Sequence, residues 1–116
     1  MENTGESLRQ QKVAAQLQKD ISDIFTRELS NLGRGVILSV TKVRMSPDLA
    51  LAKVYLSVFP FAKSEEIVGR VQAAGSTIRG AVGKKVRNQL RITPELAFFI
   101  DDSMEYAENI DRLIKL

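Results

Sequence analysis

The sequence contains no cysteine and no histidine. Without cysteine a chain cannot form a disulfide, a thiolate zinc site or a thiol nucleophile, and without histidine it lacks the commonest general base at neutral pH. Long apolar runs are also missing, and residues 1–6 have neither the basic nor the apolar part of a secretory signal. We therefore expect a cytoplasmic protein that neither spans a membrane nor works as a cysteine or histidine enzyme.

The composition that remains is typical of one globular domain. The chain has 116 residues, of which 44% are apolar and 27% charged. A chain of this length should bury roughly 60% or more of its unfolded surface around one core. We expect a single domain over residues 1–116, present as a monomer, with residues 1–6 disordered.

Acidic and basic residues are sorted into different segments, although the net charge is only +3. Residues 79–91 hold five bases and no acid, whereas residues 95–116 hold six acids and two bases. This sorting predicts a basic face and an acidic end. A basic face suits phosphate polyanions, because neutralising them releases condensed counterions. The alternative is a set of solvated bases that bind nothing.

Periodicity predicts the elements of the first half. Apolar residues recur at helical spacing over residues 7–30, and Gly33 can end that helix. Two segments rich in valine, leucine and isoleucine, residues 36–45 and 49–59, flank a Ser-Pro-Asp turn and predict a β-hairpin. The even-numbered positions of the second strand should face the core. Tyr55 points the other way and is expected to pack on a cross-strand neighbour rather than stack an RNA base.

The second half predicts two helices, a strand and a last helix. Pro60 ends the hairpin, and Ser64 is expected to cap a helix that runs to about Ala74. A kink then leads into a helix whose apolar stripe is Ile78, Val82, Val86 and Leu90. A strand over residues 95–100 follows Pro94, and Asp102 with Glu105 resembles the capping box of a helix ending at Leu116.

Helices collected on one face of a small sheet make an α+β two-layer sandwich. The inward positions of its elements should form the core: Leu17, Ile21, Val54, Leu56, Val82, Val86 and Phe98.

The helix after the kink carries the main candidate site. At 100° per residue, Lys84, Arg87 and Arg91 would share an arc away from the apolar stripe, with Lys85 beside them. We interpret this arc as a phosphate-binding ridge, since acidic partners four residues away are missing; the alternative is a solvated face. Arg79 lies near the stripe, where a structural ion pair is as plausible as an RNA contact. Lys12, on the basic side of the first helix, is a further candidate.

The kink itself is the second candidate. Ala74, Gly75 and Ser76 are small, so a phosphate could approach the backbone N–H groups at a helix N-terminus closely. A plain packing kink is the alternative reading of the same residues.

Three segments in this order resemble the ribosome-binding factor A family. They are Met45 to Tyr55, Ile78 to Lys84 and Leu90 to Phe99, and the similarity extends from about Arg9 to Ile110. The family has a type II KH-like fold, in which an Ala-x-Gly kink replaces the usual phosphate-clamping loop. Here the kink reads Ala-Gly-Ser, with the glycine displaced by one position.

The resemblance implies a non-enzymatic factor without cofactors that binds the rRNA of the small ribosomal subunit. It further implies assistance with late maturation and release before translation, with a releasing GTPase as a candidate partner. Because only 6% of the residues are aromatic, phosphate contacts should dominate over base stacking. A Gly-x-x-Gly at Gly80 and Gly83 falls inside the striped helix, so we assign it to close helix packing instead.

Other functions stay open as alternatives. A KH-like domain could serve another RNA, and a protein-interaction adaptor could use the sheet edge or the acidic end. Asp101, Asp102, Glu105 and Glu108 are close in sequence, but helix capping explains most of them and no calcium-loop spacing is present. A metal or hydrolase site is therefore not favoured.

Overall fold

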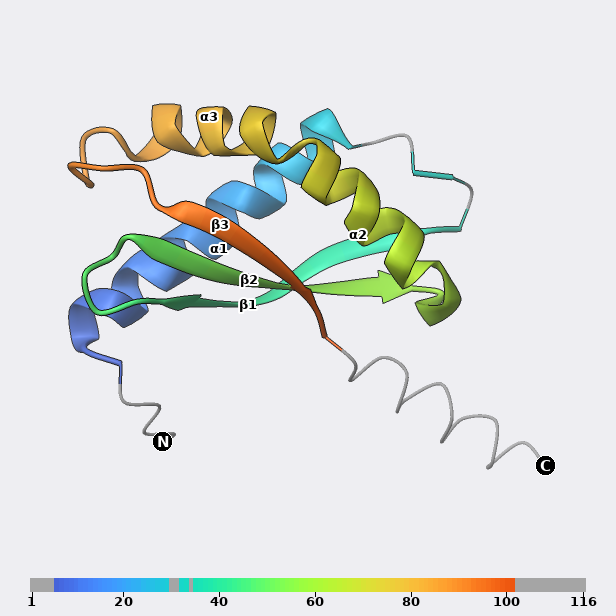
Figure 1. Ribbon diagram of the computed structural model, residues 1–116, viewed down its shortest axis with the longest axis horizontal. Helices are drawn as coiled ribbons and strands as arrows, with labels where there is room; N and C mark the ends of the chain where they lie inside the picture. Colours follow the sequence, from blue (N-terminus) through green and yellow to red (C-terminus); the bar gives the residue numbers. More distant parts are fainter. Residues whose placement is uncertain (1–5, 30–31, 34, 102–116) are drawn as a thin grey trace.

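The described part of the chain forms a three-stranded sheet and three helices, each of which the sequence predicts (Figure 1). The computed structural model describes residues 6–29, 32–33 and 35–101. In chain order the elements are α1 (Leu8–Glu28), β1 (Ile37–Met45), β2 (Leu51–Phe59), a 3-10 turn η1 (Phe61–Lys63), α2 (Ser64–Ala73), α3 (Gly75–Val86) and β3 (Glu95–Ile100). The helix expected over residues 102–116 lies outside the described residues, as do residues 1–5.

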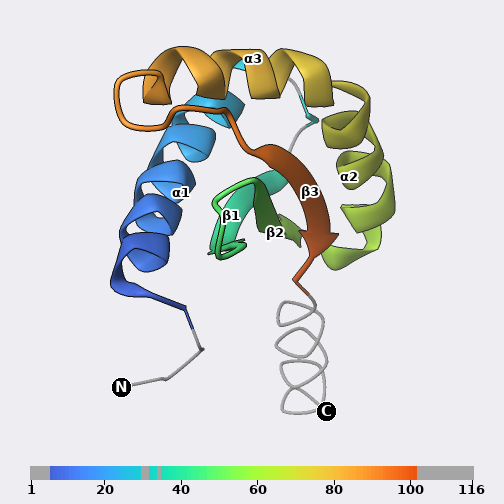
Figure 2. The same cartoon turned by 60° about the vertical axis from the view of Figure 1, so that its left-hand side comes forward.

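The sheet has the order β1-β2-β3, with β1 antiparallel and β3 parallel to β2. A parallel neighbour needs a crossover connection, and α2 and α3 supply it. The helices cover one face of the sheet, and α3 runs from α2 across to α1 (Figure 2). This is the predicted α+β sandwich. Within the described ranges, no helix has the length and apolarity that crossing a bilayer requires.

A capping box starts α1 and ties it to the sheet. The Ser7 hydroxyl accepts from the backbone N–H of Gln10 at 3.1 Å, and the side-chain oxygen Oε1 of Gln10 accepts from the backbone N–H of Ser7 at 2.7 Å. The buried Gln10 amide also donates to the backbone carbonyl of Met45 at 2.9 Å. Glu6 accepts from the Met45 N–H at 3.2 Å, so the last of the six residues expected to be disordered contacts the end of β1.

The core matches the expected positions with one exception. Leu17, Ile21, Val54, Leu56, Val82 and Val86 are all buried. Phe98 is only half-buried, although it packs against the core and its ring centroid lies 6.4 Å from that of Phe25. The reason is that β3 is an edge strand with β2 as its one neighbour in the sheet.

The hairpin and the faces of β2 are as predicted. Ala52, Val54, Leu56 and Val58 are fully buried. Tyr55 lies on the opposite face and stacks on Phe99, its partner across the parallel pair of strands, with 5.5 Å between ring centroids. The expectation of cross-strand packing for Tyr55 is therefore confirmed.

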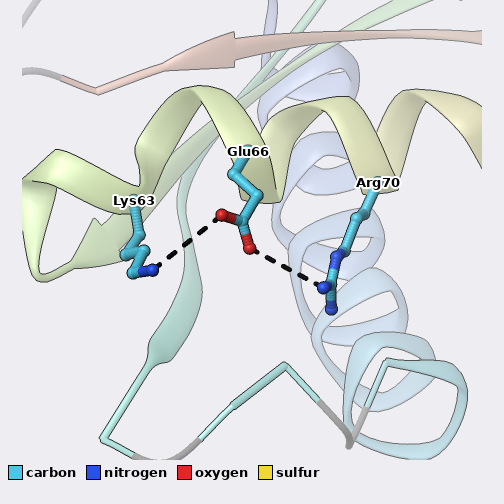
Figure 3. Close-up of polar contacts among 3 residues, drawn as sticks. All are labelled: Lys63, Glu66 and Arg70. Atoms are coloured by element: carbon cyan, nitrogen blue, oxygen red, sulfur yellow. Dashed lines mark ion pairs between the residues drawn. The ribbon is translucent and has the colours of Figure 1, made fainter.

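The predicted cap of α2 is wrong. An N-cap needs an extended backbone, but Ser64 has helical angles (φ −56°, ψ −48°) because η1 leads directly into the helix. Its buried hydroxyl has no hydrogen-bond partner among the described residues. Near this end of the helix the exposed Glu66 carboxylate forms ion pairs with Lys63 at 3.9 Å and Arg70 at 3.6 Å (Figure 3).

The predicted length of α3 is also wrong. The helix ends at Val86, and residues 87–89 form turns in which the N–H groups of Gln89 and Leu90 both bond to the Val86 carbonyl at 2.8 Å. The chain must reverse here to bring Glu95 beside Leu51 at the start of β3. Leu90 is still buried, which explains why the apolar stripe suggested a longer helix.

Candidate nucleic-acid interface

Helix α3 presents one face to the core and the other to solvent. Ile78, Val82 and Val86 are buried. Ser76, Gly80 and Lys84 are exposed on the opposite side, because residues four apart share a helix face. The exposed face therefore begins with small groups at the kink and ends with a cation.

A hollow of about 560 Å³ lies along this face; we call it the α3 hollow. The described residues that line it are Ser76, Arg79, Gly80, Gly83, Lys84, Arg87 and Thr93. Three of them are cations and none is an acid. Such a concave cationic surface attracts anions, because the charges add without an internal counterion.

Arg79 has a structural role at the wall of the α3 hollow. Its Nε donates to the carbonyl of Pro94 at 3.2 Å and its Nη2 donates to that of Thr93 at 2.9 Å. The structural role expected of Arg79 is thus present, with backbone carbonyls in place of a carboxylate. A guanidinium has five N–H donors, so Arg79 can hold the loop and still donate to a phosphate.

The two glycines of α3 have different surroundings. A Cβ on Gly83 would lie 2.9 Å from Oγ1 of Thr93, whereas a Cβ on Gly80 would meet nothing within 4 Å. Gly83 therefore permits close approach of the loop before β3, not of another helix. The expectation of close helix packing is wrong for both glycines, since Gly80 faces open space.

A second hollow, of about 500 Å³, separates α3 from the end of α1. Its charged lining residues are Arg27, Glu28, Lys84 and Lys85. Lys84 thus stands between the two hollows. Arg27 was missed as a site residue, because its sequence position on the solvent side of α1 does not reveal that the end of α1 lies beside α3. Thr93 was also missed, because the sequence does not reveal that the loop before β3 packs against α3.

The kink is built without an unusual backbone. Ala74 has φ −91° and ψ 10°, and its N–H donates to the carbonyls of Arg70 and Val71, both at 3.1 Å. Gly75 does not adopt a positive φ, and a Cβ there would meet nothing within 4 Å. Of the three kink residues, Ser76 lines both hollows, while the half-buried Ala74 and Gly75 line neither.

Two candidate residues lie apart from this cluster. Arg91 is in the loop after α3, so its placement on a helical arc with Lys84 and Arg87 is wrong, because the helix ends at Val86. Lys12 is exposed on α1 and lines neither hollow. The structure therefore brings together Ser76, Arg79, Lys84, Lys85 and Arg87 from the predicted set. In the described part of the chain, no group of three or more acids could hold a metal ion.

Comparisons with known proteins agree with this architecture. The sequence profile described as ribosome-binding factor A matches residues 9–114. The factor from Christiangramia forsetii is 41% identical over 95% of this chain and 85% of its own length, and that from Cytophaga hutchinsonii is 40% identical over 94% and 82%.

Solved structures show the same fold. The crystal structure of ribosome-binding factor A from Thermus thermophilus has a TM-score of 0.68 and 23% identity, covering 78% of this chain and 94% of that one. A homology model of the Thermus factor, fitted into a cryo-EM map of a complex with the 30S subunit, gives a TM-score of 0.62 at 23% identity, covering 77% of this chain and 91% of the other. The profile and the 40% identity of the relatives go further than the fold: this chain belongs to the ribosome-binding factor A family, a family of ribosome-binding factors that are not enzymes.

Proposed function

We propose that this chain binds the small ribosomal subunit through its rRNA and assists late maturation of the subunit and processing of its rRNA. The observation that carries the proposal is the α3 hollow, in which Arg79, Lys84 and Arg87 surround a concave surface without an acid. The 30S complex of the Thermus relative supports the choice of partner.

The mode of binding follows from the chemistry of this surface. Lys84 offers a compact charge and Arg87 a planar fork of donors, and both suit phosphate oxygens. Ser76 and Gly80 add no bulk between the cations and the kink, so an RNA backbone can lie along α3. Phosphate contacts position a nucleic acid without reading its bases, so we expect recognition of rRNA shape with a strong dependence on salt.

The remaining candidate residues lie beside the α3 hollow or apart from it. Lys85 and Arg27 add cations at the second hollow, which Glu28 also lines. Arg91 in the following loop, Ala74 and Gly75 at the kink, and Lys12 on α1 would contact more distant parts of the same RNA. The chain acts as a monomer in the cytoplasm, and release by a GTPase before translation completes the proposed cycle.

Sedimentation of ribosomal particles tests the proposal. The tagged full-length chain should travel with free small subunits and their precursors, and much less with translating ribosomes. Cells depleted of the chain should accumulate small-subunit precursors with unprocessed rRNA. Equal distribution over polysomes, or absence from every ribosomal fraction, would contradict the proposed function.

A further inference from the structure

The sheet face opposite the helices is a second surface with chemistry of its own; we call it the open sheet face. The strand register aligns Lys42 of β1, Tyr55 of β2 and Phe99 of β3 in one row across the sheet. Arg44 and Lys53 are paired in the next row. Because side chains alternate along a strand, both rows point away from the buried even-numbered residues of β2.

The first row is an aromatic platform with a cation on it. The rings of Tyr55 and Phe99 stack with 5.5 Å between centroids and 28° between planes. Lys42 Nζ lies 4.8 Å from the Tyr55 centroid. Phe99 is 42% exposed although it is a large apolar residue, and Phe59, four residues along β2 from Tyr55, is 43% exposed. Stacking among the side chains thus leaves ring surface open to solvent.

The charges on this face are cationic at its centre. Lys42, Arg44 and Lys53 occupy two adjacent rows, and none of the three forms an ion pair with a described residue; the ion pairs among the described residues join Glu66 of α2 to Lys63 of η1 and Arg70 of α2. Acids lie at the margins. Glu95 is one row beyond Lys53, and Asp101 accepts from the Thr41 hydroxyl at 2.7 Å.

We propose that the open sheet face binds an unpaired segment of RNA, with bases stacked on Phe99 and Phe59 and phosphates held by Lys42, Arg44 and Lys53. Exposed aromatic rings beside cations suit single strands, because every base has a face that can stack and every nucleotide carries a phosphate. A protein partner would have to desolvate three cations that no acid neutralises on this face, which is costly without matched carboxylates.

This inference depends on the proposed function only for the assumption that the bound polymer is RNA. The open sheet face lies on the opposite side of the sheet from α3, so its contacts are separate from those of the α3 hollow. RNA bound to the open sheet face would be a second segment of the polymer. That segment would be unpaired, whereas the segment at the α3 hollow is recognised through its phosphate backbone.

Binding of a short fluorescent oligouridine to the full chain tests the inference. Phe99→Leu keeps an apolar side chain but removes the ring, and should weaken binding about fivefold or more, since base stacking is lost. Lys42→Gln with Lys53→Gln should weaken binding and lower the slope of log affinity against log salt by about 1.4. Matched controls are Leu8→Ala, which removes an exposed apolar group, and Arg9→Gln with Lys19→Gln, which removes the same charge from α1.

Each outcome decides the matter. Phe99→Leu binding as tightly as the Leu8→Ala control, or a loss in the lysine pair no larger than in its α1 control, would overturn the inference. If Phe99→Leu does not fold, Phe99→Tyr should fold and retain affinity, and the lysine pair still provides the test. Photocrosslinking with 4-thiouridine should label the peptides of β2 or β3; label confined to α3 would also overturn it.

The same oligonucleotide separates this inference from the proposed function. In a Lys84→Gln, Arg87→Gln background the α3 hollow is disabled, so Phe99→Leu should weaken the residual affinity for oligouridine by about fivefold or more, as it does in the wild-type background. Loss of small-subunit binding in the α3 variant with no effect of Phe99→Leu on oligouridine would leave the proposed function standing and refute the second surface.

Discussion

The contact between Gly83 and Thr93 predicts opposite effects of the same substitution at two positions of α3. Replacing glycine by alanine inside a helix stabilises it by about 1 kcal/mol, because alanine loses less backbone entropy on folding. Gly80→Ala should show this gain, since a Cβ there meets nothing within 4 Å. Gly83→Ala places its Cβ 2.9 Å from Oγ1 of Thr93, a distance at which one of the two must move.

The size of the effect follows from what must move. Thr93 is half-buried, and its carbonyl accepts a hydrogen bond from Arg79, so the loop cannot shift without disturbing that bond. Overpacking of this kind typically costs about 1–3 kcal/mol. Gly83→Ala should therefore be between neutral and about 2 kcal/mol destabilising after the helix gain is subtracted. Thr93→Ala removes the blocking atom, so Gly83→Ala should become stabilising in that background.

Urea unfolding of Gly80→Ala, Gly83→Ala, Thr93→Ala and the double variant Gly83→Ala with Thr93→Ala measures these changes in the free energy of unfolding. The difference between Gly80→Ala and Gly83→Ala isolates the packing term, and the double variant with Thr93→Ala measures its coupling. Equal stabilisation by both glycine replacements, with no coupling to Thr93, would refute the placement of the loop against α3.

Three further predictions concern the core, the start of α1 and the hairpin turn. Leu56→Ala should lower the free energy of unfolding in urea by about 2–5 kcal/mol because Leu56 is fully buried, and a loss within about 0.5 kcal/mol, as expected for the exposed control Leu8→Ala, would contradict it. Gln10→Ala should cost about 1–2 kcal/mol in thermal melts, since Gln10 completes a capping box and a buried hydrogen bond; an unchanged melting temperature would speak against both contacts. A hydrogen bond from the Ser46 hydroxyl and, to a smaller extent, one from the Ala50 N–H lower the pKa of Asp48 below its ordinary value. The ionised Asp48 carboxylate therefore stabilises the hairpin turn above its ordinary pKa, and this stabilisation is lost as the pH falls through the lowered pKa. An NMR titration should show that pKa rising in Ser46→Ala, and no change would exclude the hydroxyl as the main cause.

Local signals in the sequence were sufficient for most of the sheet. The strand over residues 95–100 was predicted with its observed bounds, because Pro94 fixes its start and its residue types favour a strand. The hairpin followed from a Ser-Pro-Asp turn between two β-rich segments. Both features depend on residues that are neighbours in the chain, which is why the sequence alone reveals them.

Features set by distant parts of the chain were not predictable. The stripe ending at Leu90 suggested a helix through Arg91, yet α3 ends at Val86 and Leu90 joins the core from the segment that follows the helix. The wrong cap at Ser64 has a local cause instead, because the 3-10 turn immediately before it already gives Ser64 a helical backbone. Periodicity describes a face and cannot show where the chain reverses.

The candidate site was predictable in its charges but not in its shape. Lys84 and Arg87 were predicted from helical periodicity, and the structure places both on the α3 hollow, with Arg87 just past the end of the helix. Thr93 lines the α3 hollow and Arg27 lines the second hollow only because the loop before β3 and the end of α1 pack beside α3. The roles of these residues in RNA binding stay predictions.

The salt dependence of small-subunit binding tests the central proposal most directly. Lys84→Gln with Arg87→Gln should weaken binding to purified small subunits and lower the slope of log affinity against log salt by about 1.4 to 1.8, because each lost phosphate contact removes roughly 0.7 to 0.9. The same net charge is removed from α1 by Arg9→Gln with Lys19→Gln, which should change the slope much less. If the two double variants bind alike at every salt concentration, placement of the charge does not matter and the α3 hollow is not the rRNA-binding surface.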